Sequence, residues 1–153
     1  RAGVNVELII RGICCIKPGV KGLSHRVRVV SIVGRFLEHA RVFYFKNRGK
    51  PELYLSSADW MPRNLDHRVE LMVPVEEPAH RSFWLKVMEL QLKDNVKARE
   101  LKPDGRWERV ARAKGKRLIN SQEAVHQLAL AQIAKEAQAS LEGKVRSFEP
   151  IKP

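Results

Sequence analysis

A histidine and an arginine stand where an apolar, β-branched segment begins. His39 and Arg41 precede the run "VFYF", and residues two apart in a strand point to the same face. The turn "KNRGK" at residues 46–50 predicts a hairpin, whose second arm brings a polar run back beside them. The candidates on that arm and in the bend after it are Ser57, Asp59, Arg63 and Asn64. We therefore expect six polar side chains to gather at one end of a sheet.

These residue types suit an oxyanion such as a phosphoryl group. An arginine guanidinium can hold two phosphate oxygens at once, and serine and asparagine add neutral hydrogen-bond donors. A histidine can hold or release a proton near neutral pH. The chemistry predicted from this cluster is therefore phosphate binding or phosphoryl transfer.

Each residue also has a plainer interpretation. A lone histidine at the start of a strand is often an ordinary surface residue, Asp59 can cap a turn, and Asn64 can bond its own backbone. Asp66 and Arg68 can form a surface ion pair that contributes little. Spacing alone leaves these alternatives open.

The cluster needs strands to position it. β-branched and aromatic runs predict strands at residues 5–10, 25–33, 41–45, 51–57 and 67–75. We expect "RGICCI" at 11–16 to continue the first strand and "GRFLEH" at 34–39 to form one helical turn. The run "HRVELMVPV" at 67–75 is nearly continuously apolar, which predicts a central strand.

Two helices and a basic segment follow. Pro78 is placed to begin a helix whose apolar face includes Phe83, Val87 and Leu90. The segment 93–117 carries a Pro-Asp-Gly turn and is predicted to be extended or loop. A last helix is predicted at 118–142, capped by Asn120 with Glu123. Its apolar stripe is Val125, Leu128, Ile133 and Ala137. The order of elements predicts one α/β domain over 1–153, a mixed sheet flanked by helices.

The charge predicts a polyanionic partner. The formal net charge is +12, from 29 Lys+Arg against 17 Asp+Glu. Residues 93–120 hold ten basic and four acidic side chains, and residues 1–31 hold six and one. Such a field attracts nucleic acid, acidic lipid or polyphosphate. A solvated basic face that only maintains solubility is the alternative.

The remaining features bear on the compartment. Cys14 and Cys15 are adjacent, so they do not readily pair with each other, and no zinc-ligand spacing surrounds them. We expect two thiols on or near a buried strand in a reducing cytoplasm, with a reactive-thiol role as the alternative. No apolar run is long enough to span a bilayer, although the basic charge is compatible with a peripheral position at the membrane. Because Arg1 stands first, we expect a piece of a longer chain.

Three segments in this order and spacing resemble a known family. "RGICC", "SIVGRFLEHARVFYF" and "YLSSADWMPRNLDHRVE" are similar to the C-terminal domain of bacterial polyphosphate kinase, and the resemblance runs from about Val4 to Glu123. It implies a phospholipase-D-like fold, in which two similar halves face each other and each contributes a histidine. Arg41 stands where that superfamily has lysine, and Lys46 where it has aspartate. Both departures favour the kinase branch over a phosphodiesterase.

The resemblance implies a reaction and roles. The reaction is reversible transfer of the terminal phosphate of ATP to inorganic polyphosphate, with ADP as product and Mg²⁺ as cofactor. The phosphorylated histidine is implied to lie in a preceding domain of the same chain. His39 is implied to be the second active-site histidine, contacting the nucleotide phosphates, and Arg11 the arginine that grips them. Arg41, Ser57, Asp59, Arg63 and Asn64 are weaker candidates from this sequence. No metal ligand is assigned in this chain.

Three hypotheses result. In the first, the chain is one half of a polyphosphate kinase site, inactive alone, in a homo-oligomeric cytoplasmic enzyme with no specific nucleic-acid partner. The basic stretch 93–117 would then line the path of the polyphosphate. In the second, it is a single-histidine, phospholipase-D-like nuclease that works as a dimer. In the third, it is a non-catalytic module that binds polyanions by charge alone.

Overall fold

The strands form two separate sheets in the computed structural model, which describes residues 2–112 and 114–141. The larger sheet has the order β1-β2-β6-β7, and only the β1–β2 pair is parallel. Its strands are β1 (Val6–Ile9), β2 (Val27–Ile32), β6 (Ala98–Leu101) and β7 (Trp107–Arg109). The smaller sheet is an antiparallel meander of β3 (Arg41–Phe45), β4 (Glu52–Ser56) and β5 (Met72–Pro74). The mixed α/β architecture that the sequence predicts is confirmed.

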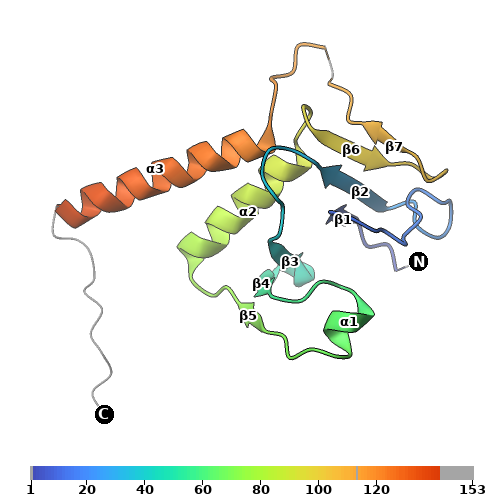
Figure 1. Ribbon diagram of the computed structural model, residues 1–153, viewed down its shortest axis with the longest axis horizontal. Coiled ribbons are helices and arrows are strands. Elements are labelled where there is room, and N and C mark those ends of the chain that lie inside the picture. Colours follow the sequence, from blue (N-terminus) through green and yellow to red (C-terminus); the bar gives the residue numbers. More distant parts are fainter. Residues whose placement is uncertain (1, 113, 142–153) are drawn as a thin grey trace.

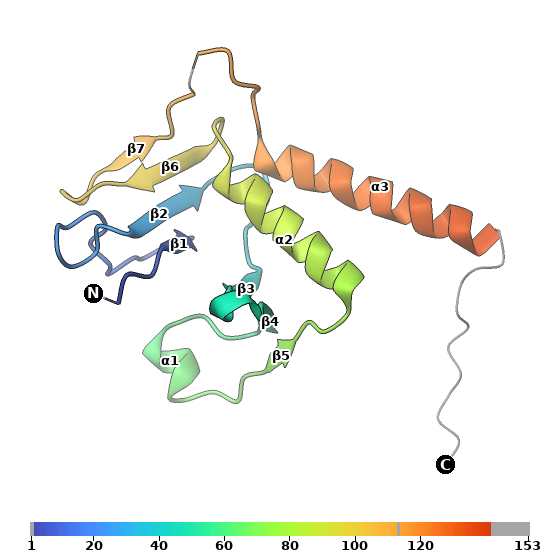
Figure 2. The ribbon, with the colours of Figure 1, turned by 180° about the vertical axis from the view of Figure 1, so that it is seen from behind.

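Two long helices adjoin the sheets (Figures 1 and 2). Helix α2 (Pro78–Leu92) starts after β5 and ends beside the first turn of α3 (Ser121–Leu141), which extends away from the sheets. Two short helices, η1 (Asn47–Gly49) and α1 (Pro62–Leu65), lie in the turn after β3 and in the bend after β4. Pro78 occupies the first turn of α2, as predicted, where its missing N–H leaves no bond unmade. None of the described helices is long and apolar enough to cross a bilayer.

The core lies mainly on the central strands of the larger sheet. Val29 and Val30 on β2 are fully buried, and Ala98 on β6 is nearly so. Outside this sheet, the buried apolar residues among those described include Leu53 on β4, Ala58 after β4 and Val87 on α2. Strand β2 is thus anchored in the core, and it leads into the segment 33–39 that ends at His39.

The predicted continuation of the first strand through "RGICCI" is wrong. The last backbone bond of this strand runs from Ile10 N to Val30 O, at 2.8 Å. Gly12 then adopts a φ of +100°, a left-handed conformation that ends the extended run. Cys14 and Cys15 therefore lie in a loop, half-buried and exposed respectively, rather than on a buried strand.

Two further predictions, of a central strand and of a helical turn, are wrong. The strand expected at 67–75 is only β5, and it lies at an edge rather than at the centre because β4 is its one partner. Its residues are exposed in the described chain, and Val69 before it is fully exposed. The helical turn expected at 34–39 is absent, and those residues are irregular.

The last helix is capped by a residue far away in the sequence. Ser121 donates from its backbone N–H and its hydroxyl to Asp94 Oδ2, both at 2.7 Å. The predicted cap does not form, because the buried Asn120 Oδ1 has no hydrogen-bond partner among the described residues. A carboxylate is the stronger acceptor for the free N–H groups at a helix start. The predicted end of this helix at residue 142 lies outside the described residues.

The predicted apolar stripe of this helix is buried only in its first half. Val125 and Leu128 are half-buried, whereas Ile133 is 61% exposed and Ala137 is exposed. The basic segment before the helix is extended as predicted, because β6 and β7 form a hairpin closed at Lys102–Gly105. Its residue 113 lies outside the described residues.

Candidate active site

Arg41 joins the predicted histidine to the predicted aspartate. As the first residue of β3, it lies opposite Ser56 of β4, so the hairpin brings Asp59 within reach. Arg41 Nε donates to Asp59 Oδ1 at 3.0 Å, and Nη2 lies 3.0 Å from the same oxygen. Arg41 Nη2 also lies 2.9 Å from His39 Nε2. Asp59 thus fixes the guanidinium, and the guanidinium fixes the imidazole.

A second cluster lies in the same bend and centres on Glu70. Ser57 Oγ donates to Glu70 Oε2 at 2.5 Å, and Asn64 Nδ2 donates to Oε1 at 2.8 Å. Ser57 Oγ also accepts from the Leu71 backbone N–H at 2.9 Å. The Ser57 and Asn64 bonds lower the pKa of Glu70 below its usual value, and the charges of Arg68 and Arg41 lower it further. Sequence reasoning did not select Glu70, although it ends the motif that contains the other candidates.

This arrangement gives Ser57 and Asn64 a structural task. Their bonds to Glu70 tie the two ends of the bend after β4 together. Asn64 is 2% exposed, and its Oδ1 has no hydrogen-bond partner among the described residues. Their role as phosphate donors stays a prediction.

An aromatic pair closes the same bend. Trp60 stacks on Phe43 of β3 with ring centroids 5.4 Å apart and planes inclined by 16°. One face of the indole remains open, since Trp60 is 73% exposed. The bend after β4 is therefore held by its polar side chains, and the exposed ring of Trp60 covers its outer side.

Arg11 stands apart from this hydrogen-bonded cluster but beside the histidine segment. It follows β1 and lines a cavity of about 320 Å³ with Ile32 and residues 33–38, which end just before His39. Its exposed guanidinium makes no ion pair or hydrogen bond with the described residues. A structural salt bridge from Arg11 to Asp59 or Glu70, the plainer interpretation of this arginine, is not formed among the described residues: Arg41 pairs with Asp59, and Ser57 and Asn64 bond Glu70. Arg11 is therefore available to an anion.

The other charged residues of this bend form no ion pairs among the described residues. Arg63 lies on α1 with an exposed side chain and no ion pair within the described part of the chain. The surface pair that Asp66 and Arg68 could form is not among the ion pairs of the described residues. Arg63 therefore stays a weaker prediction.

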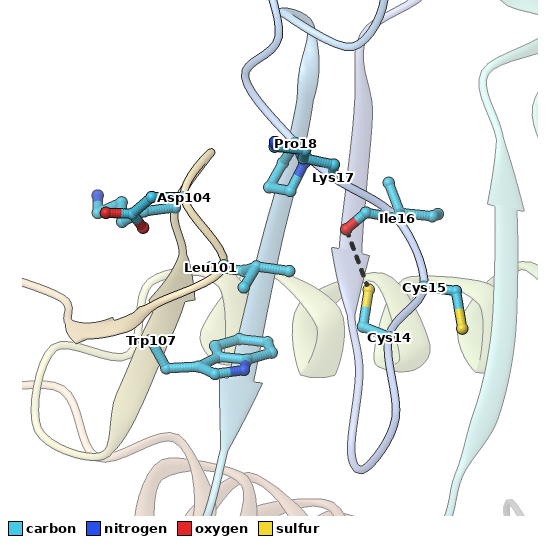
Figure 3. A pocket seen from close by; sticks show the side chains of 10 residues that line it. Cys14, Cys15, Ile16, Lys17, Pro18, Leu101, Asp104 and Trp107 are labelled. Atoms are coloured by element: carbon cyan, nitrogen blue, oxygen red, sulfur yellow. Dashed lines mark hydrogen bonds between the residues drawn. The ribbon is translucent and has the colours of Figure 1, made fainter.

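A second cavity, of about 380 Å³, contains none of the predicted site residues (Figure 3). The cysteine loop and the β6–β7 turn line it, with Trp107 opposite Cys14. Cys14 Sγ donates a long bond of 3.8 Å to the Ile16 carbonyl. Across the described residues, no group of three or more His, Cys, Asp or Glu side chains could hold a metal ion.

The fold and the comparisons with known proteins identify the class and the family of the chain. The mixed α/β fold is phospholipase-D-like, and it carries a histidine bonded to an arginine and, within the described residues, a cavity lined by a second arginine that has no ion pair or hydrogen bond. A family model described as polyphosphate kinase C-terminal domain 2 matches residues 1–122. The chain belongs to this family.

Relatives and a solved structure agree with the family. The chain is 54% identical over 123 residues to polyphosphate kinase 1 of Chlorobaculum tepidum, covering 80% of this chain and 17% of the relative. It is 44% identical over its whole length to the polyphosphate kinase of Rhodopirellula baltica, of which it spans 18%. The crystal structure of polyphosphate kinase from Porphyromonas gingivalis matches 85% of this chain and 20% of that one, with a TM-score of 0.80 at 36% identity. The chain thus spans less than a fifth of the curated relatives' length.

Proposed function

We propose that this chain forms one half of a polyphosphate kinase active site, in which the terminal phosphate of ATP is transferred reversibly to inorganic polyphosphate. The observation that carries the proposal is that the Arg11 guanidinium, which has no ion pair or hydrogen bond with any described residue, lines the same cavity as the segment leading to His39. Phosphoryl transfer depends chiefly on positioning and on neutralising the phosphate oxygens. An arginine that has no partner among the described residues, in a cavity lined by the segment that leads to His39, suits both requirements.

The residues would divide the work as follows. Arg11 grips the nucleotide phosphates, and His39 contacts them and protonates the leaving oxygen. Arg41, fixed by Asp59, is a positioning residue that sets the angle of the imidazole. The histidine that becomes phosphorylated belongs to a preceding domain, so this half is inactive alone. The family resemblance implies Mg²⁺ in this reaction; no group of three or more His, Cys, Asp or Glu side chains that could hold a metal ion lies among the described residues, and no step is assigned to the metal.

The basic hairpin suits a polyphosphate path. Arg99 and Arg109 lie directly opposite each other on β6 and β7, and both are exposed. Neither has an acidic partner among the ion pairs of the described residues. Like charges directly opposite on neighbouring strands repel each other, and a bound polyanion would remove that repulsion. We therefore include this hairpin, within segment 93–117, in the proposed path. We further propose a homo-oligomeric, cytoplasmic enzyme without a specific nucleic-acid partner.

The test is steady-state kinetics of the full-length enzyme carrying Arg11→Ala, His39→Ala or Arg48→Ala. Arg48 is a matched control, because it is an exposed arginine in the turn between β3 and β4. Losing a charge-assisted clamp of about 1.5–3 kcal/mol predicts a fall in kcat/KM for ATP of about 10- to 100-fold for Arg11→Ala. Arg48→Ala should change it less than twofold.

Two outcomes would contradict the proposal. If Arg11→Ala and Arg48→Ala behave alike, the phosphate clamp is wrong. If the wild-type enzyme nicks plasmid DNA and His39→Ala abolishes the nicking, the nuclease hypothesis is correct instead. Binding that depends on salt but on neither Arg11 nor His39 would favour the non-catalytic module.

A further inference from the structure

A buried glutamine holds the segment that leads to His39. Gln122 lies in the first turn of α3 and is 8% exposed. Its Oε1 accepts from the Phe36 N–H at 3.0 Å, and its Nε2 donates to the Phe36 carbonyl at 2.7 Å. One side-chain amide thus pairs with both backbone groups of Phe36, as a neighbouring strand would.

The same segment is held a second time at Glu38. Gln122 Nε2 donates to Glu38 Oε1 at 2.8 Å, and Gln91 Nε2, from α2, donates to Glu38 Oε2 at 3.0 Å. Each carboxylate oxygen therefore receives a bond from a neutral amide, and the two amides come from different helices. We call Gln122, Gln91 and their bonds to Phe36 and Glu38 the glutamine clamp.

Among the described residues, only the glutamine clamp holds this segment by hydrogen bonds. Within the described chain, residues 34–38 lie outside every strand and helix, and none of them makes a backbone–backbone hydrogen bond. The same residues line the cavity that contains Arg11. The segment that lines the proposed phosphate site is therefore held in place by side chains of α2 and α3.

Gly34 shows how closely the clamp is fitted. A Cβ built on Gly34 would stand 2.3 Å from Gln122 Oε1 and 2.8 Å from Gln122 Cδ. Real Cβ atoms essentially never approach that closely, so a larger residue here would displace the amide that bonds Phe36. Glycine at this position permits the clamp.

We propose that Gln122, assisted by Gln91, is a positioning residue for phosphoryl transfer, acting through the segment 34–38. The clamp would fix the cavity wall at the angle that places His39 against the nucleotide phosphates. It would also engage the carboxylate of Glu38, which lines the same cavity as Arg11. A carboxylate released from these amides would compete with phosphate for the guanidinium. This inference rests on the function proposed above.

The first variant is Gln122→Ala in the full-length enzyme, with Gln132→Ala as the matched control. Gln132 lies on the same helix but is exposed, and its side chain bonds Glu136, one turn further along α3. Misplacing a phosphate-site wall predicts a fall in kcat/KM for ATP of about tenfold or more. Hydrogen exchange of the Phe36 amide should accelerate by about tenfold or more, because its acceptor is removed. Gln132→Ala should leave both quantities unchanged.

Two further variants separate positioning from general damage. Gln122→Glu places a carboxylate against Glu38 and should be worse than Gln122→Ala. Adding Glu38→Gln to Gln122→Glu restores an amide–carboxylate pair of the same size and should recover part of kcat/KM. Gly34→Ala removes no polar group yet should reproduce the Gln122→Ala defect. The double variant that carries both Gly34→Ala and Gln122→Ala should lose little more activity than either single variant, since both changes break the same contact.

The outcomes distinguish this inference from the proposed function. If wild-type enzyme transfers phosphate and Gln122→Ala matches Gln132→Ala in both readouts, the clamp has no positioning role. An equal loss in Gln122→Glu with and without Glu38→Gln would also overturn it. If Gln122→Ala does not fold, the exchanged pair, which conserves side-chain size, decides the question by the same criterion. If the wild-type enzyme transfers no phosphate, the proposed function fails, and the positioning role fails with it.

Discussion

The bond network of Asp94 gives the strongest stability prediction. Its side chain is fully buried between the end of α2, the start of β6 and the first residue of α3. Oδ1 accepts from the backbone N–H groups of residues 96, 97 and 98 at 2.9, 2.7 and 2.9 Å, while Oδ2 accepts the two bonds from Ser121. One carboxylate thus satisfies five donors from two parts of the chain.

Asp94→Asn keeps the shape and removes an acceptor. Whichever way the amide is turned, its NH₂ group faces at least two donors that the carboxylate now satisfies. A buried donor left without a partner costs about 1–3 kcal/mol, and bonds to a charged group are the stronger kind. We therefore expect Asp94→Asn to lower the free energy of unfolding by about 3–5 kcal/mol, a large share of the 5–15 kcal/mol typical of a domain.

The assay is urea unfolding of the 153-residue chain, followed by far-ultraviolet circular dichroism. Asp104→Asn is the control, because Asp104 also accepts from a backbone N–H, of Arg106, but is exposed on the hairpin turn. It should barely move the unfolding midpoint. A loss below about 1 kcal/mol for Asp94→Asn would refute the reasoning, because it would mean that the five bonds are replaced without cost.

The pH dependence of Asp94 provides an independent check. Burial raises the pKa of Asp94, but the hydrogen bonds from Ser121, Lys97 and Ala98 outweigh it, so the pKa lies below its ordinary value of 3.8. The folded state therefore favours the ionised form. Its contribution is fully present above pH 3.8 and is lost as the pH falls through the lowered, folded-state pKa. The stability difference between wild type and Asp94→Asn should narrow over the same range.

Two further predictions concern the bend and the cysteine loop. Because the bonds from Ser57 and Asn64 lower the pKa of Glu70 below 4.5, Glu70→Gln should lower the melting temperature at pH 7. This difference from wild type should disappear as the pH falls through the lowered pKa, and a difference that does not change with pH would contradict the assignment. Cys15 is exposed and Cys14 half-buried, so Cys14→Ser should leave a thiol that reacts with a disulfide reagent faster than the thiol left in Cys15→Ser. Equal rates would show that the loop does not shield Cys14.

The sequence predicted elements well where local patterns decide them. The β3–β4 hairpin, the start of α2 at Pro78 and the return of Asp59 towards Arg41 follow from strand alternation and turn residues. The pairing of Arg41 with Asp59 needs only residues eighteen positions apart across one hairpin. A local pattern contains that information.

The errors occur where distant parts of the chain decide the outcome. Residues 34–39 have a helical composition, but Gln122 takes the backbone bonds of Phe36 that a helix would use. Asp94 displaces Asn120 as the cap of α3 across 27 positions. An apolar run indicates burial but not what covers it, so β5 was placed at the centre of a sheet rather than at its edge. A sequence pattern within one segment does not reveal such partners, because they lie in distant parts of the chain.

The outward reach of α3 makes this helix a lever. Its root is fixed by Asp94 and Gln122, while residues 130–138 are exposed and extend away from the sheets (Figures 1 and 2). At about 1.5 Å per residue, its 21 residues extend roughly 31 Å. A tilt of about 5° at the root would move the far end by roughly 3 Å over that length. A force applied to the outer turns of α3 therefore exerts a torque on its first turn, where Gln122 bonds Phe36 and Glu38. Because the outer part of the helix is long, a small force there produces a large torque on the segment that leads to His39.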